Sequence, residues 1–318
     1  MLAAVNLNHR AAAVVDEVAS NCDALRIAVA HTASGVRLVD CGVQAPGGLS
    51  AGVALARICL ADLGDVALVQ DDDRKLLGPL VTVRTDFPWQ ACMASQYAGW
   101  QVKGDAYFAM GSGPMRACAA REPLFADLEF QETSEVCVGV LEASALPPDE
   151  VCVEVAQKCG VEPAQLTLLV ASTKSLAGNV QVVARSVETA LHKLHELKFD
   201  VRRVVSAWGS APLPPPAKDD LAAIGRTNDA VLYGGRTTLF VRGDDASIEE
   251  AGAHLPSSSS SDYGRPFAEL FAEREYDFYR IDPLLFSPAQ VTIANVDTGR
   301  AFRFGDVADD VLLTSFGL

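Results

Sequence analysis

An arginine and a glutamate three residues apart, Arg185 and Glu188, could form a catalytic pair within residues 178–199. Apolar residues recur there at helical spacing, which predicts one long amphipathic helix with Arg185 roughly opposite the apolar stripe. In the functional interpretation, Arg185 holds Glu188 ionised in a cleft beneath a substrate. In the structural interpretation, the two side chains form a solvated ion pair that stabilises the helix by roughly 0.2–0.5 kcal/mol. Spacing alone leaves both interpretations open.

The pair belongs to a continuous polar row along one face of the predicted helix. The members of this row recur every three or four residues: Gln181, Arg185, Glu188, His192 and His195. A predicted strand at residues 165–173 leads into this helix through a polar loop that contains Lys174 and Gly178. Helix starts that follow strands are frequent ligand sites, so the approach to the helix favours a cleft.

A second candidate is the sequence MGSGPMRA at residues 110–117. Gly111 and Gly113 leave backbone N–H groups uncovered and Arg116 follows, so an anion such as phosphate or carboxylate could bind there. The motif lacks the Gly-Lys-Ser/Thr ending of a P-loop, and it misses the dinucleotide pattern G-x-G-x-x-G. An ordinary tight turn explains the same glycines.

Two further segments combine aromatic residues with glycine. In SQYAGWQV (95–102), Tyr97 and Trp100 could stack on a planar ring or pack in the core. In TNDAVLYGGRTTLFV (227–241), the Tyr-Gly-Gly sequence at 233–235 breaks what reads as two strands. A bulge or turn requires glycine there with or without a ligand.

Composition excludes several classes of protein. The 318 residues are 49% hydrophobic and 21% charged, which is typical of a globular protein. The net charge of −15 argues against general affinity for nucleic acid or an anionic membrane. The N-terminal residues lack the pattern of a secretory leader, and no apolar run reaches the length of about 18 residues that a membrane span needs. The eight cysteines are scattered without a CxxC pair, which favours reduced thiols in a cytosolic protein and no metal site.

Strands and helices alternate in the middle of the chain, whereas hairpins are expected at residues 25–42 and 290–305. This pattern predicts an α/β (mixed α+β) fold of two α/β lobes with mixed sheets and flanking helices. We expect an N-terminal lobe of residues 1–130 and a C-terminal lobe of residues 131–318, either of which could be discontinuous. The proline-rich segment 211–220 is an extended connector between or within domains, and the serine run 257–261 is expected to be a mobile loop.

Four motifs in this order resemble the methenyltetrahydromethanopterin cyclohydrolase family: SQYAGWQV, MGSGPMRA, SLAGNVQVVARSVET and TNDAVLYGG. The resemblance covers essentially the whole chain, and the acidic composition and serine-rich loop are similar to those of members from methylotrophic bacteria. It implies a cytoplasmic enzyme of one-carbon metabolism and formaldehyde oxidation, which acts as a homotrimer without a metal or redox cofactor. It also implies a pterin pocket between the two lobes.

The family's A-R-x-x-E sequence matches Ala184, Arg185 and Glu188, so the resemblance implies that the arginine and the glutamate are catalytic. The implied reaction is the reversible hydrolysis of 5,10-methenyl-tetrahydromethanopterin to the 5-formyl compound. Glu188 is then expected to be the general base for water, with Arg185 as its orienting and electrostatic partner. The substrate contacts expected from motif position are Gln181, Ser95, Gln96, Tyr97, Gly111, Ser112, Gly113, Arg116, Lys174, Asn228, Tyr233, Gly234 and Gly235.

Two other functions stay open on the sequence alone. One is a phosphate-ester or nucleotide-binding enzyme that uses the GSGPMRA loop as an anion cradle. The other is a non-catalytic pterin-binding protein. The intact pair of Arg185 and Glu188 argues against the second, since a binding protein has no need for a base.

Overall fold

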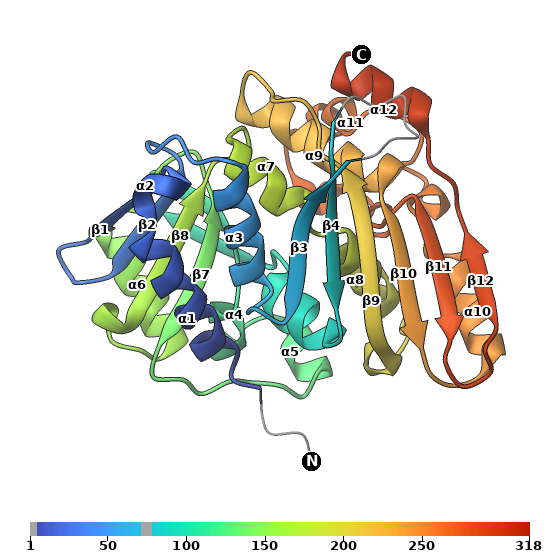
Figure 1. Ribbon diagram of the computed structural model, residues 1–318, viewed down its shortest axis with the longest axis horizontal. Helices are drawn as coiled ribbons and strands as arrows, with labels where there is room; N and C mark the ends of the chain where they lie inside the picture. Colours follow the sequence, from blue (N-terminus) through green and yellow to red (C-terminus); the bar gives the residue numbers. More distant parts are fainter. Residues whose placement is uncertain (1–4, 71–77) are drawn as a thin grey trace. The chain divides into compact units, whose positions relative to one another are not determined.

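A computed structural model describes residues 5–70 and 78–318, which form two compact units (Figure 1). Unit 1 comprises the chain up to Leu63 and the segment Ala94–Gln181. Unit 2 comprises Gly64–Met93 and Val182–Leu318. The last passage from unit 1 to unit 2 falls inside a helix, α7 (Leu176–Val183). The expected division of the chain near residue 130 stays a prediction, because compactness does not show which segments fold independently.

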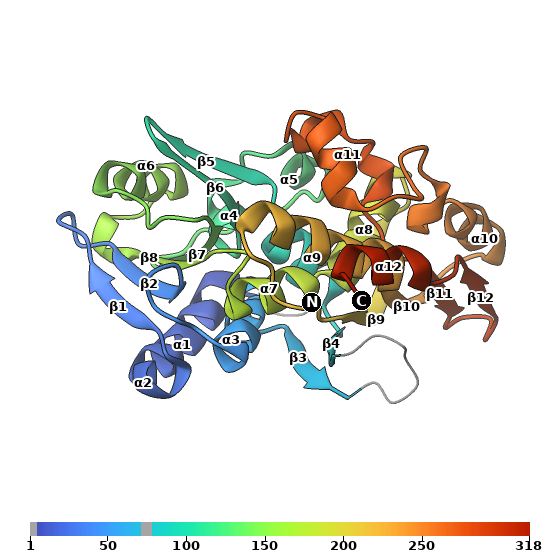
Figure 2. The same ribbon diagram turned by 90° about the horizontal axis from the view of Figure 1, so that it is seen from above.

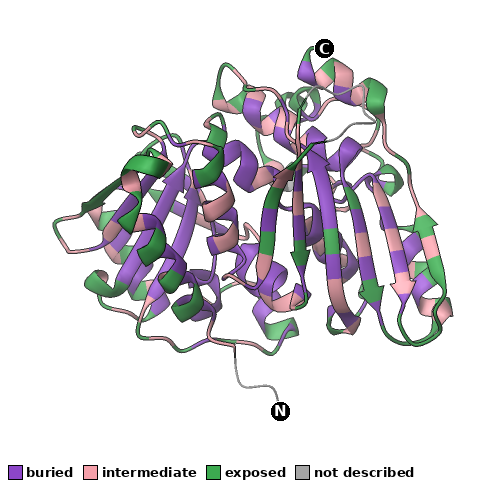
Figure 3. Cartoon of the chain, viewed as in Figure 1, coloured by how far each residue is buried: buried purple, intermediate pink, exposed green. Residues whose placement is uncertain are grey.

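Unit 1 is built on a six-stranded sheet with the order β1-β2-β8-β7-β6-β5. Its strands are β1 (Ala28–His31), β2 (Arg37–Gly42), β5 (Trp100–Gly104), β6 (Tyr107–Ser112), β7 (Cys137–Glu142) and β8 (Leu166–Ala171). Strands β2, β8 and β7 are parallel, and the other neighbours are antiparallel. These three central strands are buried along almost their whole length (Figure 3), as expected where helices cover both faces of a parallel sheet.

The helices of unit 1 pack on both faces of this sheet (Figure 2). They are α1 (Leu7–Ser20), α2 (Cys22–Leu25), α3 (Leu49–Cys59), α4 (Met115–Ala119), α5 (Pro123–Asp127), α6 (Asp149–Cys159) and the start of α7, with a 3₁₀ turn η2 (Pro163–Gln165). Helices α1 and α3 and the first turn of α7 share one apolar core, and α4 and α6 share the other. Glycine allows the close approach of α3 to α7, because a Cβ at Gly52 would lie 2.7 Å from the Cβ of Val180.

Unit 2 contains a second six-stranded sheet with the order β12-β11-β10-β9-β4-β3. Its strands are β3 (Gly64–Val69), β4 (Leu80–Thr85), β9 (Val204–Pro212), β10 (Arg236–Val241), β11 (Gln290–Asn295) and β12 (Ala301–Phe304). Strands β10 and β11 are parallel, and the other neighbours are antiparallel. Buried residues such as Leu239 and Val241 alternate with exposed ones such as Phe240, so one face packs on helices and the other is open.

The remaining elements belong to unit 2 or join the units. They are a π-helix η1 (Trp89–Gln96), the helices α8 (Ser186–Glu196), α9 (Asp220–Gly234), α10 (Asp245–Ala253), α11 (Phe267–Glu273) and α12 (Asp309–Phe316), and the 3₁₀ turns η3 (Val201–Arg203), η4 (Ser257–Ser259), η5 (Phe278–Arg280) and η6 (Pro283–Leu285). Helix α8 contacts β4, β9 and β10, while α9 contacts α11 and α12. Among residues 5–70 and 78–318, the helices are too short or too polar to span a bilayer.

Two mixed sheets with flanking helices confirm the predicted α/β fold class, and both predicted hairpins are present as β1–β2 and β11–β12. The expected strand–glycine–strand pattern in residues 227–241 is wrong in its first half. There the chain continues as helix α9 to Gly234 because its residues pack between β9, α11 and α12. The proline-rich segment 211–220 is a connector within unit 2, from β9 to α9.

A buried carboxyl group on α9 joins the three helices of unit 2 that pack together. Asp229 is fully buried, and its carboxyl oxygens accept hydrogen bonds from the backbone N–H of Phe267 at 2.8 Å and from the hydroxyl of Ser315. Phe267 is the first residue of α11, so the side chain satisfies one of the unpaired amides of that helix. Burial raises the pKa of Asp229 to about 7, although both hydrogen bonds act in the opposite direction.

We predict that Asp229→Asn removes a pH dependence from the stability of the protein. The unfolded chain ionises this group near pH 4 and the folded protein only near 7, so the wild-type free energy of unfolding falls between those values as pH rises. The asparagine accepts from the backbone N–H of Phe267 through Oδ1, and its amide N–H donates to the hydroxyl oxygen of Ser315, so both contacts remain without a charge. Urea titrations should give equal stabilities below about pH 4 and a more stable variant at pH 8. Parallel pH profiles would contradict this role of Asp229.

Candidate active site

The expected single helix over residues 178–199 is interrupted at Ala184 and Arg185. Helix α7 ends at Val183, and α8 begins at Ser186. The carbonyl of Ser186 accepts a hydrogen bond from the hydroxyl of Thr237 on β10, at 2.9 Å, so contacts with the sheet stabilise the new helix start. The valine-rich sequence before the break also has a low helix propensity. The expected continuous polar row is therefore wrong.

The interruption places the candidate pair at the beginning of α8. Arg185 is the N-cap residue, and Glu188 lies in the first turn. The partial positive charge of a helix N-terminus stabilises a carboxylate at this position. Glu188 therefore has two sources of positive potential within unit 2, the helix start and the guanidinium of Arg185.

Arg185 and Glu188 form a buried ion pair. The distance from Nη1 of Arg185 to Oε2 of Glu188 is 3.5 Å, and the two side chains are 9% and 5% exposed. Burial of two charges costs several kcal/mol in desolvation, which one ion pair offsets only in part. A solvated surface pair does not have this geometry. Buried charges that do not strengthen a fold are frequent at functional sites.

Cys92 is a neighbour of this pair that the sequence did not indicate. It lies in η1 and is completely buried. Burial, and then the negative charge of Glu188, raise its pKa, while Arg185 acts in the opposite direction. A neutral thiol therefore lies near the carboxylate. π-Helices are rare and occur often at functional sites. The π-helical backbone of η1 therefore points to Cys92, although no sequence motif did.

In the expected anion cradle of residues 111–116, donors of Gly113 and Arg116 already bind acceptors within unit 1. The backbone N–H of Gly113 donates to the carbonyl of Ser95 at 2.9 Å, and Nη1 of Arg116 donates to the same carbonyl at 3.1 Å. Arg116 is fully buried and forms a two-pronged ion pair with Glu122. Its guanidinium also lies 5.0 Å from the ring centre of Tyr97. The positive charge is therefore already matched, which argues against a phosphate cradle.

A second group of expected contacts surrounds Cys59 in unit 1. The hydroxyl of Ser95 donates to the carbonyl of Cys59 at 2.6 Å, while Ser112 and the amide nitrogen of Gln181 each lie 3.6 Å from its sulfur. Gln181 is almost fully buried, and its Oε1 has no hydrogen-bond partner within the described residues. An unsatisfied buried acceptor is costly, so a ligand N–H would find a partner there.

The other expected contacts are placed differently. Gln96 is buried in η1, Gly111 pairs with Trp100 in the sheet, and Lys174 is exposed after β8. On α9, the side chain of Asn228 donates to the carbonyl of Ile224. Whether any of these residues touches a substrate stays a prediction.

Tyr233 and its glycines have evident roles within unit 2. The Tyr233 hydroxyl donates to the carbonyl of Arg265 at 2.6 Å and accepts from the amides of Gly264 and Arg265. Gly234 approaches Pro212 so closely that a Cβ would lie 2.7 Å from its ring, and a Cβ at Gly235 would lie 2.4 Å from the carbonyl oxygen of Val231. These contacts explain the motif by packing, and contact with substrate stays a prediction.

The serine run 257–261 contains the 3₁₀ turn η4 and is contacted by neighbouring elements, and its expected mobility stays a prediction. Lys193 on α8 is fully buried, and its ammonium group donates to the carbonyl of Pro256 at 2.7 Å and to the hydroxyl of Ser259 at 2.8 Å. The hydroxyl of Ser257 donates to the carbonyl of Leu232. Burial lowers the pKa of Lys193 to about 8, although Asp282 acts in the opposite direction.

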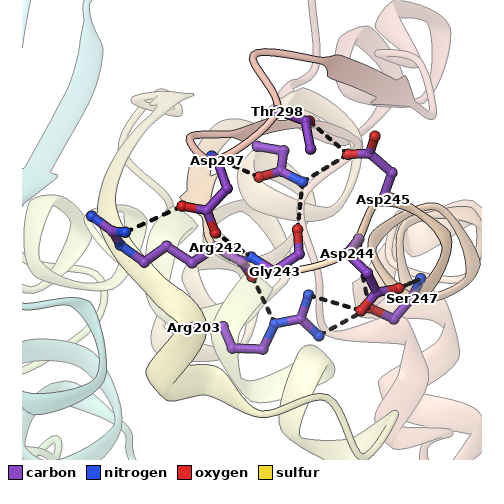
Figure 4. Close-up of polar contacts among 9 residues, drawn as sticks. Arg203, Arg242, Gly243, Asp244, Asp245, Ser247, Asp297 and Thr298 are labelled. Carbon is purple, nitrogen blue, oxygen red and sulfur yellow. Dashed lines mark hydrogen bonds and ion pairs between the residues drawn. The ribbon is translucent and has the colours of Figure 1, made fainter.

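A polar network closes the carboxyl ends of the parallel strands β10 and β11 (Figure 4). Asp297 accepts hydrogen bonds from Arg242 and from the backbone N–H of Gly243, at 3.1 and 2.8 Å. Asp245 accepts from Thr298 at 2.8 Å and from Arg300 at 3.2 Å. Each of these aspartates is matched by an arginine, so the network explains how the two strand ends are joined.

Among the described residues, no group of three or more histidine, cysteine, aspartate or glutamate side chains is placed to hold a metal ion. The eight cysteines form no disulfide there, and seven of them are buried. His192 and His195 each lie within 4 Å of the carboxylate of Glu196, at 3.8 and 3.9 Å. The expectation that the protein needs no metal or cofactor stays a prediction.

We predict that Glu122→Gln destabilises the protein by about 3 kcal/mol, because it leaves the guanidinium of Arg116 buried without its counter-charge. The matched control is Glu154→Gln, which removes the same charge from an exposed pair with Lys158. Here we expect a loss below about 1 kcal/mol. Urea denaturation followed by circular dichroism measures both. Similar losses of unfolding free energy in the two variants would show that the ion pair of Arg116 and Glu122 does not stabilise unit 1 more than an exposed pair does.

Known proteins match the chain over nearly its whole length. A family model described as "Cyclohydrolase (MCH)" matches residues 6–316. A relative from Rhodopirellula baltica is 51% identical over 292 residues, which cover 90% of this chain and 88% of the relative. Relatives from Xanthobacter autotrophicus and Methanospirillum hungatei are 46% and 40% identical, and the alignments cover 96% and 98% of this chain and 91% and 99% of the relatives. All three are named methenyltetrahydromethanopterin cyclohydrolase. The chain belongs to the MCH cyclohydrolase family.

Proposed function

We propose that this protein is a cyclohydrolase that reversibly hydrolyses 5,10-methenyl-tetrahydromethanopterin to 5-formyl-tetrahydromethanopterin. The names of the relatives supply the substrate. The buried ion pair of Arg185 and Glu188 is the observation that carries the proposal, because it provides a carboxylate in a protected environment at the start of a helix.

The chemistry of the substrate suits such a carboxylate. The methenyl bridge is an amidinium-type cation whose central carbon is electrophilic, so attack by water requires a base more than it requires a Lewis acid. A negatively charged side chain also stabilises the bound cation. A buried carboxylate does both, since its electrostatic effect is stronger in a site that excludes bulk water.

In the hydration direction, Glu188 takes a proton from water as the new C–O bond forms. It then returns this proton to N10 as the C–N10 bond breaks. The hydroxyl proton leaves as the formyl carbonyl forms, so each turnover consumes one water and releases one proton. The same steps in reverse close the ring.

Arg185 is proposed as the partner that orients Glu188 and keeps it ionised. At 3.5 Å, its guanidinium is close enough for a strong electrostatic effect. Cys92 adds a neutral neighbour that cannot compete with Glu188 for the positive charge while its thiol stays protonated. Arg185 also has the donors needed to stabilise the developing formyl oxygen.

The other expected properties are parts of the same proposal. Gln181 is the expected contact with the best structural support, because its buried Oε1 would accept a hydrogen bond from a substrate N–H. The reaction needs no redox chemistry, and we propose that it proceeds without a cofactor. The homotrimer, the cytoplasmic location and the pocket between the lobes rest on the resemblance to the family.

Turnover by three proteins tests the proposal. The loss of methenyl absorbance should be rapid with the wild type, and kcat should fall by about 10²-fold or more in Glu188→Gln. This variant should still bind substrate, because the shape of the side chain is preserved. Arg185→Ala should also lose most of its turnover, since the carboxylate is then buried without its partner.

Glu196→Gln is the matched control, because it makes the same change on the same helix at a more exposed position. Its turnover should stay within about twofold of the wild type. A wild type without turnover would remove the proposed activity and favour a pterin-binding protein. Wild-type turnover in Glu188→Gln would leave the activity but remove the base.

A further inference from the structure

The helices that follow two neighbouring strands of unit 1 pack on opposite faces of its sheet (Figure 2). Helix α6 follows β7 and shares its core with Leu141 of that strand. Helix α7 follows β8 and packs through Ala177 against the other face, which carries Leu169. The connections therefore change sides between β7 and β8. In open α/β sheets, ligands bind outside the carboxyl ends of the strands at such a switch point.

A carboxylate lies at this switch point. Glu142 is the last residue of β7, and it is level with Ala171, the last residue of β8. Two residues further along the chain, the hydroxyl of Thr173 donates a hydrogen bond to Oε1 of Glu142. Thr173 is buried and Glu142 is only partly buried. The residue that follows the end of β8 thus orients a partly accessible carboxylate at the end of β7.

The ring of a pterin presents the complementary group. Its 2-amino group and its N3–H are adjacent donors that point in the same direction, as do two N–H groups of a guanidinium. Such a pair binds the two oxygens of a carboxylate in bidentate fashion, with a geometry that a single donor cannot supply. Carboxylate oxygens accept more than one hydrogen bond each, so the bond from Thr173 is compatible with this pairing.

We propose that Glu142 binds the pterin ring of the substrate, accepting hydrogen bonds from the 2-amino group and N3–H at the carboxyl ends of β7 and β8. This inference rests on the proposed function, which supplies the pterin. The ring edge is remote from the carbon that reacts, so Glu142 binds the substrate and the transition state equally. Its loss should therefore raise KM and leave kcat nearly unchanged.

Glu142→Gln tests the pairing by its chemistry. We expect KM for methenyl-tetrahydromethanopterin to rise about 10- to 100-fold, with kcat within about threefold of the wild type. The glutamine places an N–H donor where the pterin also has a donor. Glu154→Gln on α6 removes the same charge from an exposed position in the same unit and should leave both constants unchanged.

Two ring analogues provide a readout that a purely structural role would not change. Lumazine differs from pterin by an oxygen in place of the 2-amino group, so it offers one donor and one acceptor. As competitive inhibitors, 6-methylpterin should bind the wild type at least about 10-fold more tightly than 6-methyllumazine. Glu142→Gln should lose or reverse this preference, because the amide matches lumazine. Glu142→Asp, which keeps the charge, should retain the preference with weaker binding.

Each outcome separates this inference from the proposed function. The role of Glu142 is contradicted if 6-methylpterin and 6-methyllumazine inhibit the wild type equally, or if neither inhibits it. This result needs only the wild type, so it holds even if the variants do not fold. An unchanged KM and ring preference in Glu142→Gln contradicts it as well, while turnover that depends on Glu188 would leave the cyclohydrolase intact. A wild type without turnover removes the proposed function itself.

Discussion

A buried pair of opposite charges at the start of α8 is the interaction that most constrains this chain. Arg185 and Glu188 are nearly inaccessible to water, and their attraction offsets only part of the desolvation cost, so the rest of the fold must hold them in place. The sheet of unit 2 does this by direct packing on the helix start. A Cβ at Gly209 of β9 would lie 2.5 Å from the hydroxyl oxygen of Ser186 and 2.9 Å from a methyl group of Val187, so a larger residue there would displace side chains at the helix start. The position of the ion pair therefore depends on the packing of β9 against the start of α8.

The two buried arginines illustrate how different geometries serve different roles. Arg116 forms a two-pronged pair with Glu122, donates to a backbone carbonyl and faces an aromatic ring, so its charge is fully used in holding unit 1 together. Arg185 lies at a helix N-cap and meets Glu188 at 3.5 Å. A looser pair at a helix start leaves the carboxylate able to exchange a proton, which a rigid bidentate pair opposes.

The sequence predicted what depends on short-range patterns. Alternation of apolar residues located the hairpins at residues 25–42 and 290–305. Long-range packing decided the rest. The break after Val183 depends on β10, and the helical state of 227–234 depends on α11 and α12. The contact of the serine run with the buried Lys193 also joins residues far apart in the chain.

The same distinction between short-range pattern and long-range packing applies to the candidate site. The spacing of Arg185 and Glu188 was visible in the sequence, but their burial and the proximity of Cys92 were not, because η1 is distant in the chain. Glu142 had no motif at all, since its significance comes from the faces on which α6 and α7 pack.

The central claim is that Glu188 carries out the chemical step on bound substrate. A single-turnover experiment with enzyme in excess separates this step from binding and release. With Glu188→Gln, we predict that methenyl-tetrahydromethanopterin binds fully and that its absorbance then decays at least about 100-fold more slowly than with the wild type. Decay of the bound substrate at the wild-type rate would contradict the claim.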